Sequence, residues 1–370
     1  MEIKPIGAPI LAIMEIGRKA KQIQERTNKD LLLLHSDVNS ISQIDVNQIV
    51  KNIDFNTIQL QNYPDTVGQL GLRLAINNHY FGNKADIDHI IITSGGTNGL
   101  FTILNTLNVY KVLMPKFYWG SGELLSVVNK LQHDVYQDFK SLMNAARTLN
   151  HTAVIISDIG NSLDNKTDNS ILIEVINKLD SLGIPIIFDA PYRYLFVNEQ
   201  DKFYRRLLSL ENVIINESFS KSMGLSGYRT GFIHNANHDF IDEASKRILY
   251  NTNGVNVVGQ EIIQHLLNSV KGNEIIQQYK NQATEHIKLN VEWLETHGLL
   301  VRELYSDPLP LGIYAVINID QSTLENHWIF GVSLSCFTNE KGKYDQYTRI
   351  CVSVDHTRFT QFFAPLAKTN

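Results

Sequence analysis

The chain has 370 residues, of which 43% are hydrophobic and 19% charged, so it can build a sizeable core. Its 33 Lys and Arg against 38 Asp and Glu leave a net charge of −5, which offers no basic footprint for nucleic acid or an anionic membrane. The two cysteines, Cys336 and Cys351, are too few to staple such a fold and are typical of a reducing compartment. We find no signal-peptide pattern and no uninterrupted apolar run of about 18 residues, and therefore expect a cytoplasmic protein without membrane spans.

The first expected element is an amphipathic helix over residues 8–26, followed by a short apolar run at 31–34. From 86 to 220, short runs rich in Ile and Val alternate with segments of helix length. The predicted strands are 90–92, 109–114, 153–156, 184–188 and 213–215, and the predicted helices are 98–107, 120–130 and 169–182. Because these runs are continuously apolar, they indicate strands buried on both faces, as in a doubly wound, mostly parallel α/β sheet.

The pattern changes near residue 255. Residues 255–297 are mostly helical, and three strand-like runs follow at 299–304, 311–319 and 349–354. This order predicts a smaller α+β domain. We therefore expect an N-terminal segment, 1–50, that packs with the small domain, a large domain, 51–254, and a small domain, 255–370.

The segment 217–232 carries the strongest chemical signal. It places Lys221 among serines and glycines just after a predicted buried strand, and Arg229 eight residues later between two glycines. A lysine on such a loop can form a Schiff base with an aldehyde cofactor, and an arginine fork suits a phosphate. The alternative is a solvated surface loop with two unrelated cations.

Two upstream segments add to this signal. Asp189 stands at the carboxyl end of the apolar run 184–188, where it can keep a pyridine nitrogen protonated, and Tyr192 can donate to a phenolic oxygen. Residues 91–100 read as a strand, a glycine-rich turn and a helix start, which can bind phosphate. The alternatives are a turn or helix-cap aspartate and a plain strand-to-helix connection.

Taken together, the order and spacing of these segments resemble the class I/II aminotransferases, which are fold-type I pyridoxal-phosphate (PLP) enzymes of the aspartate aminotransferase type. Ser218-Phe-Ser-Lys221, followed by Arg229-x-Gly, is the most specific block, and Asp189-x-x-Tyr192 lies at the matching distance upstream. The resemblance covers about residues 60–355. It implies the PLP-dependent transferase fold type I, with a large doubly wound domain and a smaller α+β domain.

The resemblance also implies a reaction. The enzyme would move an amino group between an amino acid and a 2-oxo acid, with Lys221 forming the internal aldimine with PLP and later carrying a proton. Asp189 would pair with the pyridinium nitrogen and Tyr192 would bond the phenolic oxygen. The phosphate would be bound by Gly96, Thr97, Ser218 and Arg229.

Four further positions follow from the same resemblance. Phe117, with Tyr118 as the fallback, would stack on the pyridine ring, and Asn161 would contact both the phenolic oxygen and the substrate. Tyr63 would reach the phosphate in the neighbouring subunit, which makes the expected active unit a homodimer. Arg349 would grip the α-carboxylate of the substrate, because its fork fits a carboxylate bidentately.

Other interpretations remain open. Lyases, decarboxylases and cyclising enzymes share this fold and these cofactor residues, and a non-catalytic PLP-binding regulator is a further alternative. The segment 34–39 stands where the family has Gly-x-Pro, so the sequence does not name the amino donor. His234 and His238 have the spacing of metal ligands but lack the rest of a zinc motif, and we assign no metal site.

Overall fold

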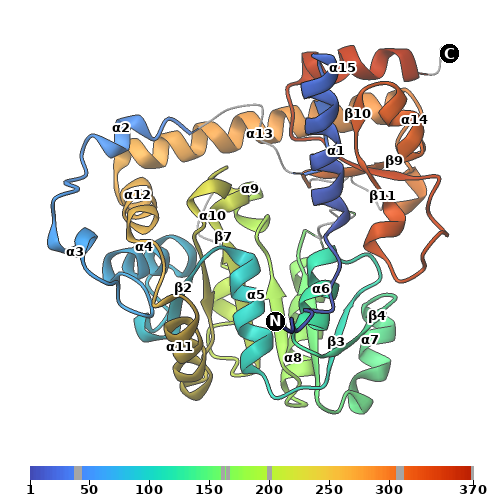
Figure 1. Ribbon diagram of the computed structural model, residues 1–370. Helices are drawn as coiled ribbons and strands as arrows, with labels where there is room; N and C mark the ends of the chain where they lie inside the picture. Colours follow the sequence, from blue (N-terminus) through green and yellow to red (C-terminus); the bar gives the residue numbers. More distant parts are fainter. Residues whose placement is uncertain (37–43, 160–162, 164–166, 198–201, 306–311, 368–370) are drawn as a thin grey trace.

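The computed structural model describes residues 1–36, 44–159, 163, 167–197, 202–305 and 312–367 (Figure 1). The helices are α1 (Ala12–Thr27), α2 (Asn47–Val50), α3 (Ile58–Gln61), α4 (Leu70–Phe81), α5 (Gly96–Thr106), α6 (Gly120–Val128), α7 (Phe139–Ala145), α8 (Asn169–Asp180), α9 (Arg193–Phe196), α10 (Phe219–Ser222), α11 (His238–Thr252), α12 (Val257–Asn268), α13 (Val270–Thr296), α14 (Gln321–Asn326) and α15 (His356–Phe363). The strands are β1 (Leu32–Leu33), β2 (Ile90–Thr93), β3 (Lys111–Pro115), β4 (Gln132–Tyr136), β5 (Thr152–Ser157), β6 (Ile186–Asp189), β7 (Val213–Ser218), β8 (Gly231–His234), β9 (Tyr314–Ile317), β10 (Ile329–Phe330), β11 (Val332–Ser333) and β12 (Thr348–Cys351). Within the described ranges, no helix is both long enough and apolar enough to cross a membrane.

The large sheet has seven strands in the order β2-β8-β7-β6-β5-β3-β4. Neighbouring strands from β7 to β4 are parallel, whereas β8 runs antiparallel to both β2 and β7. This arrangement confirms the predicted α/β class with a mostly parallel sheet. All five predicted strand runs of this region are present, but β4 and β8 were not predicted.

The inner strands of the large sheet, β5, β6 and β7, are buried on both faces, as their continuous apolar runs predicted. Ile187 packs with residues of α5 and α11 on one face, whereas its neighbours Ile186 and Phe188 pack with α8 on the other. Successive residues of a strand point to opposite faces, so each apolar run supplies two cores. The backbone at the strand ends is therefore held rigidly from both sides.

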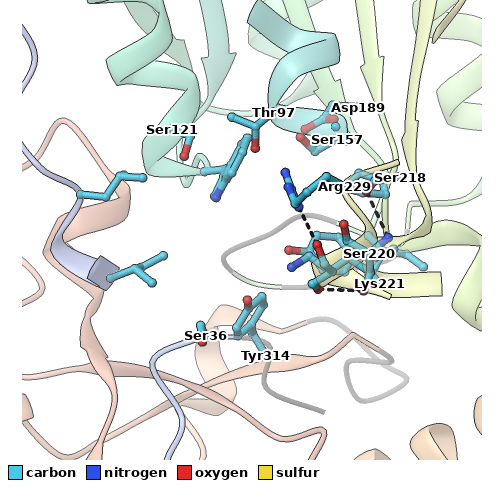
Figure 2. Close-up of a pocket in the computed structure, with 18 of the residues that line it drawn as sticks. Ser36, Thr97, Ser121, Ser157, Asp189, Ser218, Ser220, Lys221, Arg229 and Tyr314 are labelled. Atoms are coloured by element: carbon cyan, nitrogen blue, oxygen red, sulfur yellow. Dashed lines mark hydrogen bonds between the residues drawn. The ribbon is translucent and has the colours of Figure 1, made fainter. Parts of the chain in front are cut away.

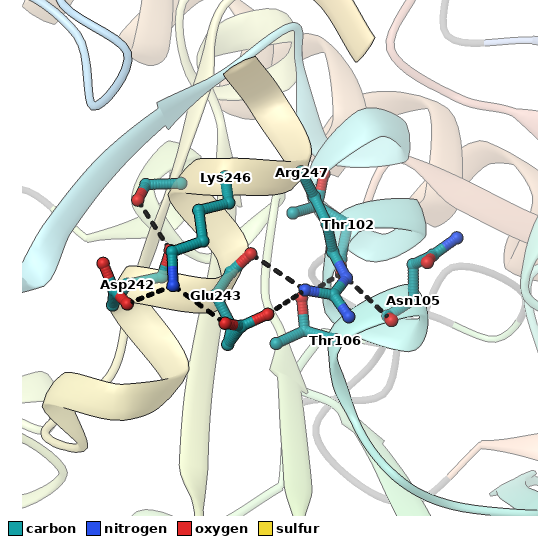
Figure 3. Close-up of polar contacts among 8 residues, drawn as sticks. Thr102, Asn105, Thr106, Asp242, Glu243, Lys246 and Arg247 are labelled. Atoms are coloured by element: carbon teal, nitrogen blue, oxygen red, sulfur yellow. Dashed lines mark hydrogen bonds and ion pairs between the residues drawn. The ribbon is translucent and has the colours of Figure 1, made fainter. Parts of the chain in front are cut away.

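At its carboxyl end, helix α5 contacts α11 through Arg247 (Figure 3). Arg247 Nε donates to the carbonyl oxygen of Asn105 at 2.9 Å, and Arg247 Nη1 donates to Glu243 Oε2 at 2.9 Å. Such exposed contacts stabilise by about 1 kcal/mol at most. They fix the carboxyl end of α5, whose amino end begins the candidate site.

The C-terminal part contains α12, α13 and the antiparallel sheet β11-β12-β9. In Figure 1, α13 runs across the top of the large sheet toward the red C-terminal elements. The predicted strand at 299–304 is wrong, because Leu300 makes only an isolated bridge to Ile317 and residues Arg302–Leu304 form a 3-10 turn. The helical prediction over 255–297 is confirmed by α12 and α13.

The N-terminal segment lies against the C-terminal elements. Strand β1 pairs in parallel with β10, and α1 runs beside the red elements in Figure 1. Two ion pairs connect these parts, Lys19 Nζ to Glu325 Oε2 at 2.5 Å and Arg358 Nη2 to Asp30 Oδ1 at 2.6 Å. The start of α1 thereby reaches toward the large sheet, beside the candidate site.

Candidate active site

A cavity of about 340 Å³ lies at the carboxyl ends of the parallel strands. Ser157 ends β5, Asp189 ends β6 and Ser218 ends β7, and all three line the cavity. Figure 2 shows Ser36 and Tyr314 facing these strand ends from across the cavity, with the start of α1 (blue) at its side. The large sheet and the terminal elements therefore build the site together, at the sheet edge where open α/β folds bind ligands.

The position of Asp189 is set by Asn216 of the neighbouring strand, its Cα partner in the parallel register. Asn216 Nδ2 donates to Asp189 Oδ1 at 2.8 Å and to the carbonyl oxygen of Gly96 at 3.1 Å. One amide group thus ties the acid to the first residue of α5. Gly99 makes room for it, since a Cβ atom there would lie 2.2 Å from Asn216 Oδ1.

The start of α5 and Arg229 form a shallow cradle. Arg229 has left-handed backbone angles, φ 51° and ψ 52°, and its Nη2 donates to the carbonyl oxygen of Ser94 at 3.3 Å. Gly95 has φ +83°, and a Cβ atom on it would lie 2.8 Å from Arg229 Nη2. The first turn of a helix has backbone N–H groups without intrahelical partners, so this cradle suits an anion.

Lys221 lies in the short helix α10, whose start is fixed on both sides. Ser218 caps this helix by accepting a hydrogen bond from the Ser220 backbone N–H at 3.2 Å, and Phe219 is fully buried in the core. Burial, together with the charges of Arg229 and Arg349, lowers the pKa of the Lys221 amine to about 7. An amine with this pKa is substantially neutral, and therefore nucleophilic, near neutral pH.

The opposite wall is aromatic. Tyr192 and Tyr314 both line the cavity, with their ring centroids 6.2 Å apart at an interplanar angle of 78°. The fully buried guanidinium of Arg349 lies between two rings, 3.7 Å from the centroid of Tyr314 and 4.0 Å from that of Phe337. Arg349 Nη2 also donates to the carbonyl oxygen of His35 at 3.3 Å.

The structure brings most of the predicted site residues into this one cavity. Those that line it are Gly96, Thr97, Asp189, Tyr192, Ser218, Lys221 and Arg229. They come from α5, β6, β7, α10 and the connections that follow these elements. The outermost two, Gly96 and Arg229, are 133 residues apart in the chain. Arg349 does not line the cavity but stacks on Tyr314, which does.

The predicted stacking residue is placed differently. Phe117 lies outside the cavity, its ring centroid 5.2 Å from that of Tyr344, and the fallback Tyr118 is buried and donates to Glu123 Oε2 at 2.9 Å. Trp119 lines the cavity instead. It is the N-cap residue of α6, and its carbonyl oxygen accepts a hydrogen bond from the Gly122 N–H at 2.8 Å.

Of the two remaining predicted positions, one lies elsewhere and the other cannot be placed. Tyr63 is 84% exposed and does not line the cavity of its own chain. Asn161 lies outside the described residues. The two histidines with metal-like spacing do not share a helix face, because His234 ends β8 and His238 begins α11, and no described group of three or more candidate ligands could hold a metal.

Sequence reasoning missed Asn216, which positions Asp189, and several residues that line the cavity. Asn216 had a usable signal, because it stands two residues before Ser218 and the period of a strand places both on the same face. Tyr314 and the α1 residues Ile13 and Met14 had none, since only the packing of the terminal elements brings them to the cavity.

Comparison with known proteins identifies the family. A family model described as aminotransferase class I and II matches residues 36–357. The chain is 23% identical over 257 residues to an aspartate aminotransferase of Pyrococcus horikoshii, an alignment that covers 65% of each chain. It is 26% identical over 196 residues to a histidinol-phosphate aminotransferase of Buchnera aphidicola subsp. Cinara cedri, covering 50% of this chain and 52% of the relative. The matches thus span less than two thirds of either curated relative.

A solved structure shows the same fold. The crystal structure of an aminotransferase from Mycobacterium tuberculosis superposes with a TM-score of 0.84 at 14% identity, and the match covers 100% of both chains. The large mixed sheet and the smaller terminal part described above are thus the architecture of fold-type I aminotransferases.

Asp189 makes the stability of the ligand-free protein depend on pH. Burial raises the pKa of Asp189 to about 6 from its ordinary value of 3.8, opposed by the Asn216 hydrogen bond. A carboxyl group whose pKa is raised on folding favours the folded state at low pH, and this stability is lost as the pH rises from 3.8 to about 6. Asp189→Asn removes this dependence, so the stability of the variant relative to the wild type should grow by about 2 kcal/mol between about pH 4 and pH 7.5.

Urea unfolding of both ligand-free proteins across that range measures the difference. Glu217, whose pKa burial raises to about 8, is present in both proteins, so most of its own pH dependence cancels. The charge of Asp189 also raises the pKa of Glu217, so its removal in the variant adds to the expected difference in the same direction. If the free energies of unfolding of wild type and variant differed by the same amount at every pH, Asp189 would be ionised across the whole range, which would contradict the prediction.

Proposed function

The chain belongs to the aminotransferase class I and II family, and we propose that it is a PLP-dependent aminotransferase acting between an amino acid and a 2-oxo acid. The observation that carries this proposal is the single cavity that gathers Lys221, Asp189 and the cradle of α5 and Arg229. An amine, a buried acid and an anion cradle are the three groups that a phosphorylated pyridine aldehyde requires.

The residues present fit that cofactor. A side chain at Gly95 would collide with Arg229, and a Cβ atom at Gly96 would lie 3.3 Å from Ser218 Cβ. The two glycines therefore keep the cradle free of side chains, so that a ligand can occupy it. Ser218 and Arg229, with the start of α5, would hold the phosphate. Asp189 would hold the ring nitrogen, and Lys221 Nζ would hold the aldehyde carbon covalently.

The bound cofactor supplies an electron sink for the bond broken at the substrate Cα. Lys221 Nζ, whose pKa is lowered to about 7 in the ligand-free protein, would be the base that takes the proton from the substrate Cα and the acid that gives it back. Asp189 would hold the ring nitrogen of the cofactor in its protonated form, and the Asn216 amide, which donates to Asp189 Oδ1 at 2.8 Å, would keep the carboxylate aligned. Tyr192 would donate to the phenolic oxygen, and Arg349 would bind the α-carboxylate of the substrate.

We propose the homodimer as the active unit, with Tyr63 completing the site of the partner. The segment around Tyr63 exposes large apolar side chains that a monomer would leave in water: Phe55, Ile58, Tyr63, Leu70 and Leu74, each at least 41% exposed. A contiguous group of this kind is typical of an obligate interface. We keep the cytoplasm as the expected location, which the low cysteine content supports.

Replacing Lys221 tests the reaction. Wild-type protein reconstituted with PLP should show a visible absorbance band. Borohydride should abolish this band and attach the cofactor covalently to Lys221. Without any acceptor, the protein should convert one equivalent of a suitable amino acid per site to 2-oxo acid. Lys221→Ala should lose the band and lower the rate of this half-reaction at least about 10⁴-fold.

The control is Lys280→Met. Lys280 is also buried, and burial lowers its pKa to about 8, but it lies on α13 beside Tyr194 and outside the candidate site. The control should keep the band. A lyase would release product without accumulating one equivalent of 2-oxo acid, and a protein that binds no PLP would contradict the proposal.

Trp119 and Phe117 form a matched pair for the stacking role. Trp119→Ala should raise the dissociation constant of PLP at least about tenfold, because the indole is the aromatic side chain of segment 115–119 that lines the cavity. Phe117→Ala should leave it unchanged within about twofold. Titration of each ligand-free variant with PLP gives both constants, and the reverse order would restore Phe117 as the stacking residue.

Mixed dimers test the role of Tyr63. Tyr63→Phe should weaken PLP binding at least about tenfold by removing a hydrogen bond to a charged group. At a PLP concentration too low to load Tyr63→Phe homodimers, a one-to-one mixture of Tyr63→Phe and Lys221→Ala protomers should regain about a quarter of the wild-type activity, because one site of each hybrid dimer has both native residues. The absence of complementation, with hybrid formation verified by mass spectrometry, would contradict sharing of Tyr63 between subunits.

A further inference from the structure

The helix that carries Lys221 is only four residues long, so its carboxyl end depends on partners from outside it. The last four carbonyl groups of a helix lack intrahelical partners. In α10, the carbonyl oxygen of Ser220 accepts a hydrogen bond from the Ser226 hydroxyl at 3.1 Å. The carbonyl oxygen of Lys221 accepts one from the Tyr279 hydroxyl at 3.3 Å. Ser226 follows α10 closely in the chain, whereas Tyr279 belongs to α13, so the second bond ties the backbone of Lys221 to a distant helix.

Tyr279 is packed tightly against the turn that follows α10. The residue is 3% exposed, and Gly224 in that turn has φ +66°. A Cβ atom on Gly224 would lie 2.9 Å from Tyr279 Cε2 and 3.0 Å from the hydroxyl oxygen. Glycine therefore both adopts the left-handed backbone and lets the ring approach. This close approach holds the ring where its hydroxyl reaches the carbonyl oxygen of Lys221.

Helix α13 is also fixed to the segment that directly follows β12, the strand of Arg349 (Figure 1). Asn290 is fully buried, and its Nδ2 donates to the carbonyl oxygens of Val352 at 2.9 Å and Val354 at 2.8 Å. Tyr279 and Asn290 belong to the same continuous helix and are separated by about 16 Å along its axis. The helix thus connects the backbone of α10 to the strand that carries the arginine.

We propose that Tyr279 is a positioning residue for Lys221. Its hydroxyl fixes the main chain of α10 and thereby holds Lys221 Nζ at the carbon atom with which the amine reacts. The inference rests on the proposed function, in which Nζ forms a double bond to the aldehyde carbon of PLP while the aldehyde oxygen leaves as water with two protons. Because a misplacement of about 1 Å can cost about 100-fold in rate, the loss of this hydrogen bond should slow the chemistry of the lysine.

Tyr279→Phe tests the role, because it removes the hydroxyl and keeps the ring against Gly224. Mixing ligand-free protein with PLP and following the visible absorbance band gives the rate at which Lys221 captures the aldehyde. We expect this rate to fall at least about tenfold in the variant. Pyridoxamine phosphate has an amine in place of the aldehyde and forms no bond to lysine. Its dissociation constant, measured by calorimetric titration, should therefore stay within about twofold of the wild-type value.

The matched control is Tyr136→Phe. Tyr136 is 7% exposed, and its hydroxyl also donates to a main-chain carbonyl oxygen, that of Ile155, at 3.1 Å. It ends β4 and does not line the cavity. Each variant loses one hydrogen bond from a buried tyrosine to a carbonyl oxygen, so urea unfolding should show a similar loss of stability in both. The control should capture PLP at the wild-type rate.

An unchanged capture rate in Tyr279→Phe would overturn the inference, and so would an equal loss of rate in Tyr136→Phe. Weaker binding of pyridoxamine phosphate by the same factor would also overturn it, because the anion cradle rather than the lysine would then be disturbed. If the wild type captured PLP but converted no amino acid, the proposed reaction would fail and the comparison of capture rates would still decide the role of Tyr279. If the wild type captured no PLP, both proposals would fail.

Discussion

The candidate site depends on keeping a carboxyl group in place at the buried end of a parallel strand. Asp189 is 92% removed from solvent, and the Asn216 amide that donates to it also donates to the first residue of α5. Without such a partner, a buried carboxylate would lose its hydration uncompensated. The same amide thus fixes the distance between the acid and the anion cradle, which are the two ends of a ligand lying between them.

This constraint explains residues that have no chemistry of their own. Gly99 lies inside α5, where glycine destabilises a helix by about 1 kcal/mol relative to alanine. The side chain of any larger residue would collide with Asn216. The glycine therefore destabilises the helix but allows β7 to pack closely against it. Gly95 serves the neighbouring contact with Arg229 in the same way.

The sequence predicted the large sheet and the residues at its strand ends better than the remaining wall of the cavity. Continuous Ile and Val runs marked β2, β3, β5, β6 and β7 because both faces are buried. Edge strand β4 alternates between exposed and half-buried residues over most of its length and has a polar composition. Strand β8 has only two large apolar residues, Phe232 and Ile233, between Gly231 and His234, so neither strand gave this signal. The apolar run 299–304 was read as a strand, but tertiary contacts fold most of it into a turn.

Within the site, residues that belong to one local motif were predictable, whereas those brought in by packing were not. Lys221, Ser218 and Asp189 stand at strand ends whose position follows from local pattern. Phe117 packs on Tyr344, whereas Trp119 lines the cavity and is the better candidate for the stacking role. No spacing rule in segment 115–119 predicts which of these aromatic residues faces the cavity.

The division between predictable and unpredictable residues matches a division of roles. Groups that would hold the cofactor under the proposed function come from the large sheet, where both faces are packed. Other residues of the cavity wall, among them Met14, Ile13 and Tyr314, come from the terminal elements that β1 and β10 join. Met14 lines the cavity and is 55% exposed, so its side chain can change without disturbing Asp189 or Lys221. Substrate preference in this fold is therefore free to vary while the chemistry at the strand ends stays fixed, which is why a family match fixes the reaction more firmly than the donor.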